Sequence, residues 1–168
     1  MEKKFRQGNI QDLEAIKQLS LLAYLQFENI LSEENILAWK ENLSKNKTYE
    51  DLFARSYCVV CEEDNSIVGS AFLVPSGNPF KWFEKEWAYI RLVAVQPEKA
   101  GQGIGKMLTK YCLQKAKEND EAIIALHTSE FQDAARHIYE GLGFKKIRDL
   151  EPSFGKQIYL YTLNLKAI

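Results

Sequence analysis

The feature that most constrains this chain is the segment 93–107, where an apolar run, three alternating glycines and an amphipathic stretch follow one another. The run Trp87 to Val95 predicts a strand that ends before Gln96-Pro97. Beyond the glycines, apolar residues recur at the spacing of one buried helical stripe, which predicts a helix that stops around Asn119. The glycines are Gly101, Gly103 and Gly105, and the stripe is Ile104, Met107, Leu108, Tyr111 and Cys112.

A strand, a glycine-rich turn and a helix in this order favour binding of an anion. Glycine lets the backbone approach a ligand closely. The unpaired N–H groups of a helix's first turn, and the positive end of the helix dipole, both point at a phosphate bound there. A turn without a ligand is the alternative interpretation. A Walker A loop is disfavoured because Ala100 and Met107 stand where it needs Gly and Ser or Thr. A dinucleotide-binding fingerprint fails because Lys106 replaces its third glycine.

The N-terminal half begins with helices and continues with a hairpin. A short strand at 5–7 precedes a helix capped by Asn9 and Asp12, and a second helix is predicted over 33–43. Residues 57–62 and 67–74 are rich in β-branched residues and predict the two strands of a hairpin. The apolar face of the first helix is predicted to hold Leu13, Ile16, Ala23 and Phe27.

The C-terminal half completes the sheet. The short apolar run 122–126 is typical of a central strand buried on both faces, and 144–150 and 157–165 predict two further strands. A helix between them carries Phe131, Ala135, Ile138 and Leu142 on one stripe, and Gly143 can end it as a left-handed cap. The element order predicts one α/β (α+β) domain over residues 1–168, with a central mixed sheet and helices on both sides.

Composition excludes several classes of protein. The chain has 22 Lys and Arg against 23 Asp and Glu, a net charge of −1, so it lacks the basic excess of a nucleic-acid-binding domain. No window approaches the roughly 18 apolar residues of a membrane span. The three cysteines and the polar start predict a reduced, cytoplasmic protein. Cys58 and Cys61 lie three apart in a strand, which places them on opposite faces, so we expect no metal site.

The glycine segment, taken with a second motif, resembles the Gcn5-related N-acetyltransferases (GNAT). Gly103 and Gly105 match that family's (Arg or Gln)-x-x-Gly-x-(Gly or Ala) pattern, whereas Ala100 stands at its first position. The second motif is a helix that carries Tyr139 before the Gly143-Phe144 strand start, with Gln132 in place of the usual Asn. The resemblance implies a GNAT fold whose central sheet is mostly antiparallel.

The resemblance also implies a site for acetyl-CoA. Backbone groups of Val93, Ala94 and Val95 would contact the pantetheine and the thioester carbonyl, and a backbone N–H would stabilise the oxyanion. Gln132 would contact the coenzyme arm. The pyrophosphate would lie on the N–H groups of the turn and the helix start, which are those of Gly101, Gln102, Gly103, Ile104, Gly105 and Lys106.

Tyr139 is the predicted general acid, since the departing thiolate needs a proton that a phenol can supply. A core aromatic without a chemical role is the alternative. His127 follows the predicted strand 122–126, at the place where some members resembling N-terminal acetyltransferases carry a Glu, and is the candidate base. Glu84, Glu86 or an ordered water chain are the other candidates for that base.

The acceptor is expected at the rim formed by the first two helices and the loops 75–86 and 151–156. Aromatic side chains there would hold a cationic amine, and carboxylates would pair with its charge. We expect the acceptor to be a polyamine, another small amine, or a protein N-terminus or lysine. We expect the protein to be a monomer or a homodimer. A coenzyme-binding module with weak or no catalysis is the alternative function, and transfer of another acyl group stays open. The rim residues are Tyr24, Phe27, Glu28, Trp82, Phe83, Glu84, Glu86 and Phe154.

Overall fold

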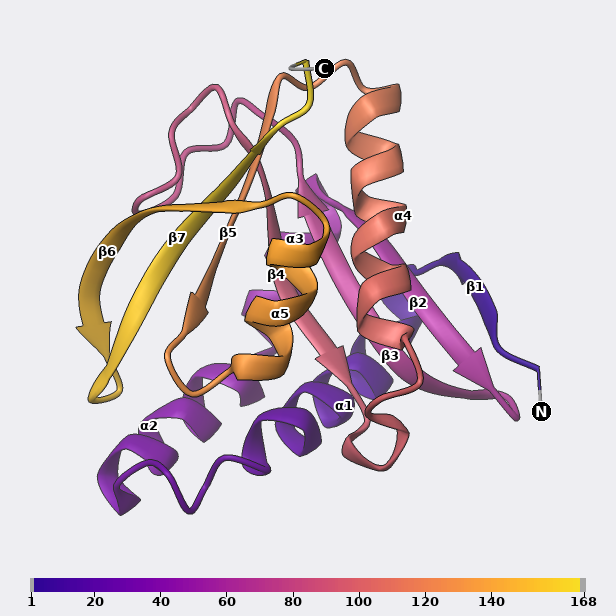
Figure 1. Cartoon of the computed structure of the whole chain (residues 1–168). Coiled ribbons are helices and arrows are strands. Elements are labelled where there is room, and N and C mark those ends of the chain that lie inside the picture. Colours follow the sequence, from indigo (N-terminus) through magenta and orange to yellow (C-terminus); the bar gives the residue numbers. More distant parts are fainter. Residues whose placement is uncertain (1, 167–168) are drawn as a thin grey trace.

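A computed structural model describes residues 2–166 and shows a seven-stranded sheet covered by helices on both faces (Figure 1). The strand order is β1-β2-β3-β4-β5-β7-β6, and all neighbours are antiparallel except β4 and β5. This confirms the predicted mixed, mostly antiparallel sheet. The strands are β1 Lys4–Gln7, β2 Tyr57–Glu63, β3 Ser66–Val74, β4 Ala88–Val95, β5 Ile123–Ser129, β6 Lys145–Ser153 and β7 Lys156–Asn164.

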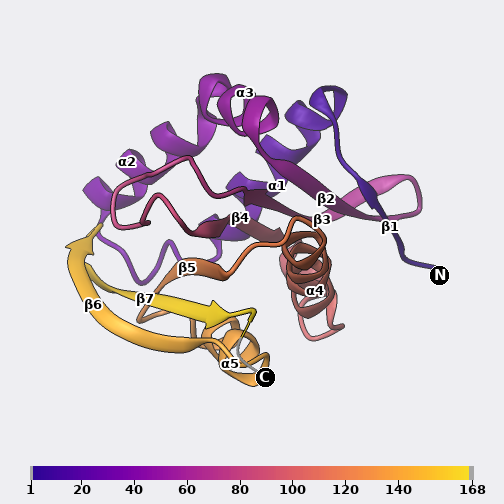
Figure 2. The same cartoon turned by 90° about the horizontal axis from the view of Figure 1, so that it is seen from above.

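The helices divide between the two faces of the sheet. Seen from above, α1, α2 and α3 lie on one side of the strands, and α4 and α5 lie on the other (Figure 2). Short 3-10 turns at Ile10–Asp12 and Pro97–Lys99 precede α1 and α4. The α-helices are α1 Leu13–Leu25, α2 Glu33–Ser44, α3 Asn46–Arg55, α4 Ile104–Glu118 and α5 Asp133–Gly141.

Two large apolar clusters hold the helices to the sheet, and a small third cluster joins α1 to β4. Under α4 and α5, the buried side chains include Leu108, Ile90 and Leu126, and under α1 and α3 they include Ile16 and Phe72. The strand β5 contributes to both clusters, as expected for a central strand. Burial of each of these side chains stabilises the fold by roughly 1.5–3 kcal/mol.

Local turn chemistry explains several boundaries. Asp64 and Asn65 join β2 to β3 with positive φ angles of 54° and 63°, the geometry of a tight hairpin turn that these residue types tolerate. At the first turn, the Asn9 side chain accepts from the Gln11 N–H at 3.0 Å and the Asp12 carboxylate accepts from the Asn9 N–H at 2.9 Å. Both polar residues therefore serve the start of the helical segment as predicted.

The structure differs from the sequence-based expectation in one missed helix and in several details. Phe131 precedes α5 instead of lying on it, and β6 runs on to Ser153, into the predicted rim loop 151–156. Met107 and Tyr111 of the predicted buried stripe are exposed. The helix α3 was not predicted, because only Tyr49 and Leu52 of its ten residues are buried. Phe27 lies beyond the end of α1, in the turns that follow it. The strand β5 runs on to Ser129, so His127 lies inside the strand instead of following it.

The described residues contain no helix long and apolar enough to cross a membrane. The three cysteines are free and buried, with Cys58 in the cluster under α1 and α3 and Cys61 in the cluster under α4. Their placement on opposite faces is as predicted. Across residues 2–166, no group of three or more His, Cys, Asp or Glu side chains is arranged to hold a metal ion.

Candidate active site

The glycine turn before α4 presents free backbone donors to the surface. Gly101 and Gly103 have φ angles of +81° and +82°, and a Cβ added to either would meet nothing within 4 Å. Glycine is therefore required by backbone conformation and not by crowding. No side chain caps α4, and its first backbone bond runs from the Met107 N–H to the Gly103 carbonyl at 3.0 Å.

The amides of Ile104, Gly105 and Lys106 consequently have no helical partner. They lie at the positive end of the dipole of a 15-residue helix, next to exposed backbone that carries no Cβ at Gly101 and Gly103. This arrangement fits a pyrophosphate.

Beside this turn, β4 and β5 separate. The two strands pair only at Ala88↔Ile124 and Tyr89↔Ala125, at the start of each strand. Beyond them β4 carries a bulge, since the register with β3 slips by one residue and Leu92 has a φ of +51°. The strands therefore leave a splayed gap (Figure 1) that opens next to the N-terminus of α4.

The predicted coenzyme strand lies along this gap. Val93 and Val95 are half-buried, and Ala94 is buried against Leu19 and Ala23 of α1. The carbonyl of Val93 accepts a hydrogen bond from the Tyr24 hydroxyl at 3.1 Å. The helix α1 thus fixes the strand from the face opposite α4.

Lys99 does not replace the side-chain donor that is absent at Ala100. Its ammonium lies 2.8 Å from the Glu63 carboxylate at the end of β2. Ala100 itself is exposed. The candidate anion site at α4 therefore offers backbone donors, with no side-chain donor at position 100.

Tyr139 sits in the last turn of α5, next to the gap. Its position is fixed by the helix end, where the Phe144 N–H donates to the Tyr139 carbonyl at 3.0 Å and Gly143 has a φ of +101°. The side chain is 7% exposed and packs edge-on against Phe144. Burial raises the pKa of Tyr139, and the nearby Tyr24 adds to the shift. The phenol therefore keeps its proton at neutral pH, and its hydroxyl has no hydrogen-bond partner within residues 2–166.

Gln132 precedes α5 and joins it to β5. Its side-chain oxygen accepts from the Thr128 hydroxyl at 3.1 Å and from the Ser129 N–H at 2.9 Å. These two bonds orient the amide so that its NH₂ group is left to donate elsewhere.

His127 lies on the opposite face of the sheet from Tyr139. Its ring meets Trp82 and Phe83, with centroid distances of 5.0 and 6.0 Å. Desolvation of the ring between these neighbours, with smaller effects of the cations Arg91 and Lys81, lowers the pKa of His127 to about 4, although the residue as a whole is exposed. His127 is therefore neutral at pH 7 but a weak base.

The predicted aromatic rim divides into two groups. Tyr24, Phe27 and Phe154 join one group, in which Trp39 of α2 and Phe131 of the β5–α5 loop link them. Trp82 and Phe83 lie instead with His127 in the other group. The carboxylates Glu28, Glu84 and Glu86 are exposed and form no ion pair with the described residues.

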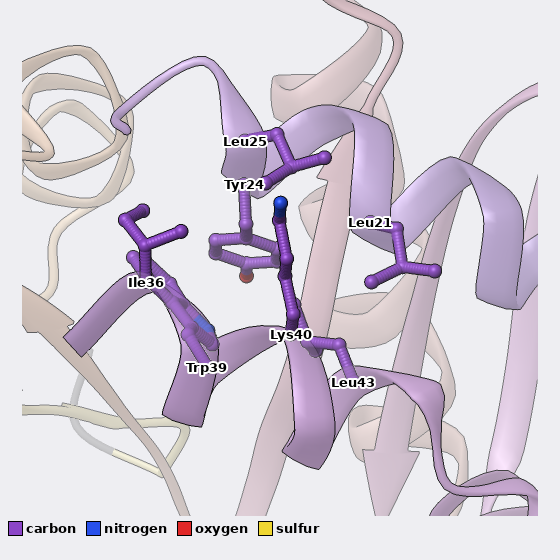
Figure 3. Close-up of a pocket in the computed structure, with 7 residues that line it drawn as sticks. All are labelled: Leu21, Tyr24, Leu25, Ile36, Trp39, Lys40 and Leu43. Atoms are coloured by element: carbon purple, nitrogen blue, oxygen red, sulfur yellow. The ribbon is translucent and has the colours of Figure 1, made fainter. Parts of the chain in front are cut away.

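The helix α2 holds the first aromatic group against α1. Tyr24 and Trp39 have ring centroids 5.0 Å apart, and both line a small pocket between the two helices (Figure 3). Its volume is about 10 Å³, room for roughly one water molecule. The contact with Trp39 of α2 therefore supports Tyr24 where its hydroxyl reaches β4.

Sequence reasoning missed three residues of this region. Trp39 and Phe131 were seen only as helical apolar positions, although both belong to the rim. Arg91 is a charged side chain in an otherwise apolar strand, and this contrast could have marked it as a candidate functional residue. Its guanidinium lies 4.5 Å from the centroid of the Phe80 ring.

Comparisons with known proteins agree with this geometry. A model of the acetyltransferase (GNAT) family matches residues 23–144. N-acetyltransferase 8B of Mus musculus is 34% identical over 116 residues, which are 64% of this chain and 49% of that protein. N-acetyltransferase 8B of Homo sapiens is 36% identical over 87 residues, which are 52% of this chain and 37% of that protein. The chain thus spans at most about half the length of these relatives.

Two solved structures share the fold. One is the PaiA N-acetyltransferase from Thermoplasma acidophilum in complex with coenzyme A, with a TM-score of 0.77, 18% identity, and coverage of 95% of this chain and 98% of that one. The other is the ribosomal-protein-S18-alanine N-acetyltransferase from Escherichia coli, with a TM-score of 0.74, 16% identity, and coverage of 99% and 96%. With the family match over residues 23–144 and the glycine turn at the splayed strands, the chain belongs to the acetyltransferase (GNAT) family, as its sequence motifs indicate.

Proposed function

We propose that the chain transfers an acetyl group from acetyl-CoA to a primary amine, by direct attack of the amine on the thioester. The observation that carries this proposal is the cluster of unpartnered amides at Ile104, Gly105 and Lys106 beside the gap between β4 and β5. The amides suit the pyrophosphate of the coenzyme, and the gap suits its extended pantetheine arm. When bound, the coenzyme supplies an activated acyl group.

The residues of the chain have distinct roles in this proposal. The backbone of Val93 to Val95 orients the acyl group, and an N–H of this strand stabilises the charge that develops on the carbonyl oxygen. Tyr139 carries a proton at neutral pH and donates it to the leaving sulfur. The NH₂ group of Gln132, left free by its bonds to Thr128 and Ser129, donates to the coenzyme arm.

The amine approaches from the face that carries His127 and loses its proton there. The low pKa of His127 favours its use as a hydrogen-bond partner for the amine or for a water chain, with solvent as the final proton acceptor. Direct attack by the amine needs no acyl-enzyme intermediate. All three cysteines are buried, so none offers an accessible thiol for such an intermediate.

The test is thiol release from acetyl-CoA with a panel of polyamines, aminoglycosides, amino acids and short peptides, beside calorimetric binding of coenzyme A. Turnover with one class of amine, dependent on Tyr139, would support the proposal. Coenzyme binding without transfer to any amine would support the alternative function of an acyl-CoA-binding module. Absence of coenzyme binding would contradict both.

A further inference from the structure

Arg91 is unusual among the arginines of the described chain. Three arginines are half-buried, and two of them pair with carboxylates, Arg6 with Asp12 at 2.9 Å and Arg136 with Asp133. Arg91 is half-buried, but its guanidinium forms no ion pair or hydrogen bond with any of residues 2–166. A half-buried guanidinium without an anion is costly, because it loses water and gains no partner.

The surroundings of Arg91 hold it in place without neutralising it. The guanidinium stacks over the Phe80 ring at 4.5 Å, and Phe80 is itself set by its pairing with Phe83. The titratable groups that act on Arg91 are Tyr89, Arg55 and Tyr24, and none is a carboxylate. The charge of Arg91 is thus preorganised and unsatisfied.

Arg91 also lies where the acceptor must pass. It is the residue before the bulge at Leu92, two positions from Val93, which corresponds to roughly 7 Å along a strand. It shares a face with Tyr89, Ala125 and His127, since its charge and that of Lys81 act on the imidazole. A group held by Arg91 would therefore lie within the span of a small molecule from the reacting carbonyl.

We propose that Arg91 binds a carboxylate on the acceptor itself, so that the substrate is a small amino acid or amino-acid derivative whose amine and carboxylate lie close together. This inference rests on the proposed transfer to a primary amine and narrows its acceptor. Arginine suits the role because its planar fork binds carboxylates through two parallel hydrogen bonds.

The same cations assist the reaction. A carboxylate next to an ammonium stabilises its charged form, and pairing of that carboxylate with Arg91 offsets this effect. Lys81 adds a positive charge nearby, so the pKa of the bound amine falls and its proton is released more readily. This compensates for the weak basicity of His127. The carboxylate that Arg91 recognises thereby also delivers the amine to a site where it becomes a nucleophile.

The test uses matched acceptors, L-phenylalanine, L-methionine and L-alanine, each beside its C-terminal amide. For each pair we expect wild-type kcat/KM to favour the acid over the amide by about 10- to 100-fold, the value of a hydrogen-bonded charge. Arg91→Gln brings the ratio near one, and Arg91→Lys, which keeps the charge but not the fork, gives an intermediate ratio. Comparison of ratios between variants cancels the difference in basicity between acid and amide.

Arg55→Gln is the matched control, because Arg55 is an exposed arginine that acts on Arg91 only through its charge. It should keep the wild-type ratio. Equal loss on acid and amide in Arg91→Gln, or a wild-type ratio near one, would overturn the inference and leave transfer to amines intact.

If no acceptor of this set turns over, calorimetry with N-acetyl-L-phenylalanine and its amide in the presence of coenzyme A decides. Binding of the acid alone, lost in Arg91→Gln, supports the carboxylate site, and binding of neither overturns it. Failure of the proposed function would appear separately, as no acetyl transfer to any amine of the wider panel.

Discussion

The Tyr24 hydroxyl donates to the Val93 carbonyl at 3.1 Å, joining two residues that are 69 positions apart in the chain. This bond ties α1 to the strand that lines the proposed coenzyme gap, just past the bulge at Leu92. Burial raises the pKa of Tyr24 to about 12, so the donor stays protonated over the working range of pH.

Tyr24→Phe should therefore destabilise the fold by about 1 kcal/mol, the typical net value of one hydrogen bond. It should also lower kcat/KM for acetyl-CoA, by less than about tenfold, because Val93 loses one of its supports. Urea unfolding and steady-state kinetics measure the two effects. Tyr111→Phe is the control, because Tyr111 is exposed and its hydroxyl bonds to no described residue. An unchanged free energy of unfolding in Tyr24→Phe would contradict the importance of this bond.

Tyr139→Phe should lower kcat by about 100-fold or more, the lower end of what a positioned acid contributes. The free energy of unfolding should stay nearly the same, since the hydroxyl has no partner among the described residues. Tyr161→Phe, which removes a bond of 2.6 Å to Glu140, should instead affect stability more than turnover. Full activity of Tyr139→Phe would leave Tyr139 as a core aromatic only.

Gly103→Ala tests the glycine turn of the anion site. Gly103 has a φ of +82°, which strains any residue that carries a Cβ, although the added Cβ would meet nothing within 4 Å. We expect a loss of stability of roughly 1–3 kcal/mol and at least about tenfold weaker binding of coenzyme A, because the turn and the first amides of α4 must shift. Gly105→Ala is the control, because its Cβ would make ordinary contacts with Ile138 at 3.6 Å and Val95 at 3.7 Å and the family pattern allows Ala at this position, so it should bind normally. Equal coenzyme affinity of the two variants would argue against this site.

Ala100→Gln should strengthen coenzyme binding by roughly two- to tenfold, since it adds one hydrogen-bond donor at an exposed position. Lys99→Ala should leave the affinity for coenzyme A unchanged, because the Lys99 ammonium is engaged by Glu63. Calorimetry on both variants measures this. Weaker binding in Lys99→Ala would mean that Lys99 leaves Glu63 and reaches the coenzyme.

The pKa of His127 has a consequence for stability. Because the unfolded chain protonates His127 near pH 6.5 and the folded protein only near pH 4, stability should fall as the pH drops through that window. His127→Gln should flatten this part of the curve of melting temperature against pH. In the activity profile the variant should lower kcat without shifting any limb near pH 6.5. The disappearance of such a limb would show that His127 titrates normally and acts as the base.

Local signals predicted most of the fold. The glycine turn and the cap at Gly143 depend on neighbours in the chain, and the structure confirms both. The stripe from Ile104 to Cys112 is confirmed in part, because Ile104, Leu108 and Cys112 are buried whereas Met107 and Tyr111 are exposed. The helix α3 escaped prediction because Tyr49 and Leu52 are too few to mark a periodic face, and its burial depends on strands that come later in the sequence.

The site was predictable only in part, for the same physical reason. The coenzyme positions follow from two continuous segments, 93–106 and 132–139, whereas the acceptor side is assembled from helices, strands and loops that are far apart in the chain. The sequence alone does not indicate which aromatic residues share a group or that His127 faces away from Tyr139. Nor does it indicate that the Arg91 guanidinium has no carboxylate partner among the described residues. Such facts depend on strand register and on the order of strands in the sheet.

The short pairing of β4 with β5 divides the sheet into two blocks. One block is β1 to β4, the other is β5, β7 and β6, and two backbone ladder pairs join them. A ligand lying between the blocks would contact both of them and hold them together. Amides along the inner edges of both strands should then exchange hydrogen with solvent readily in the free protein and slowly once the gap is filled. The unpaired backbone donors and acceptors there can hydrogen-bond to a ligand. A ligand in the gap therefore converts two loosely joined blocks into one cooperative unit.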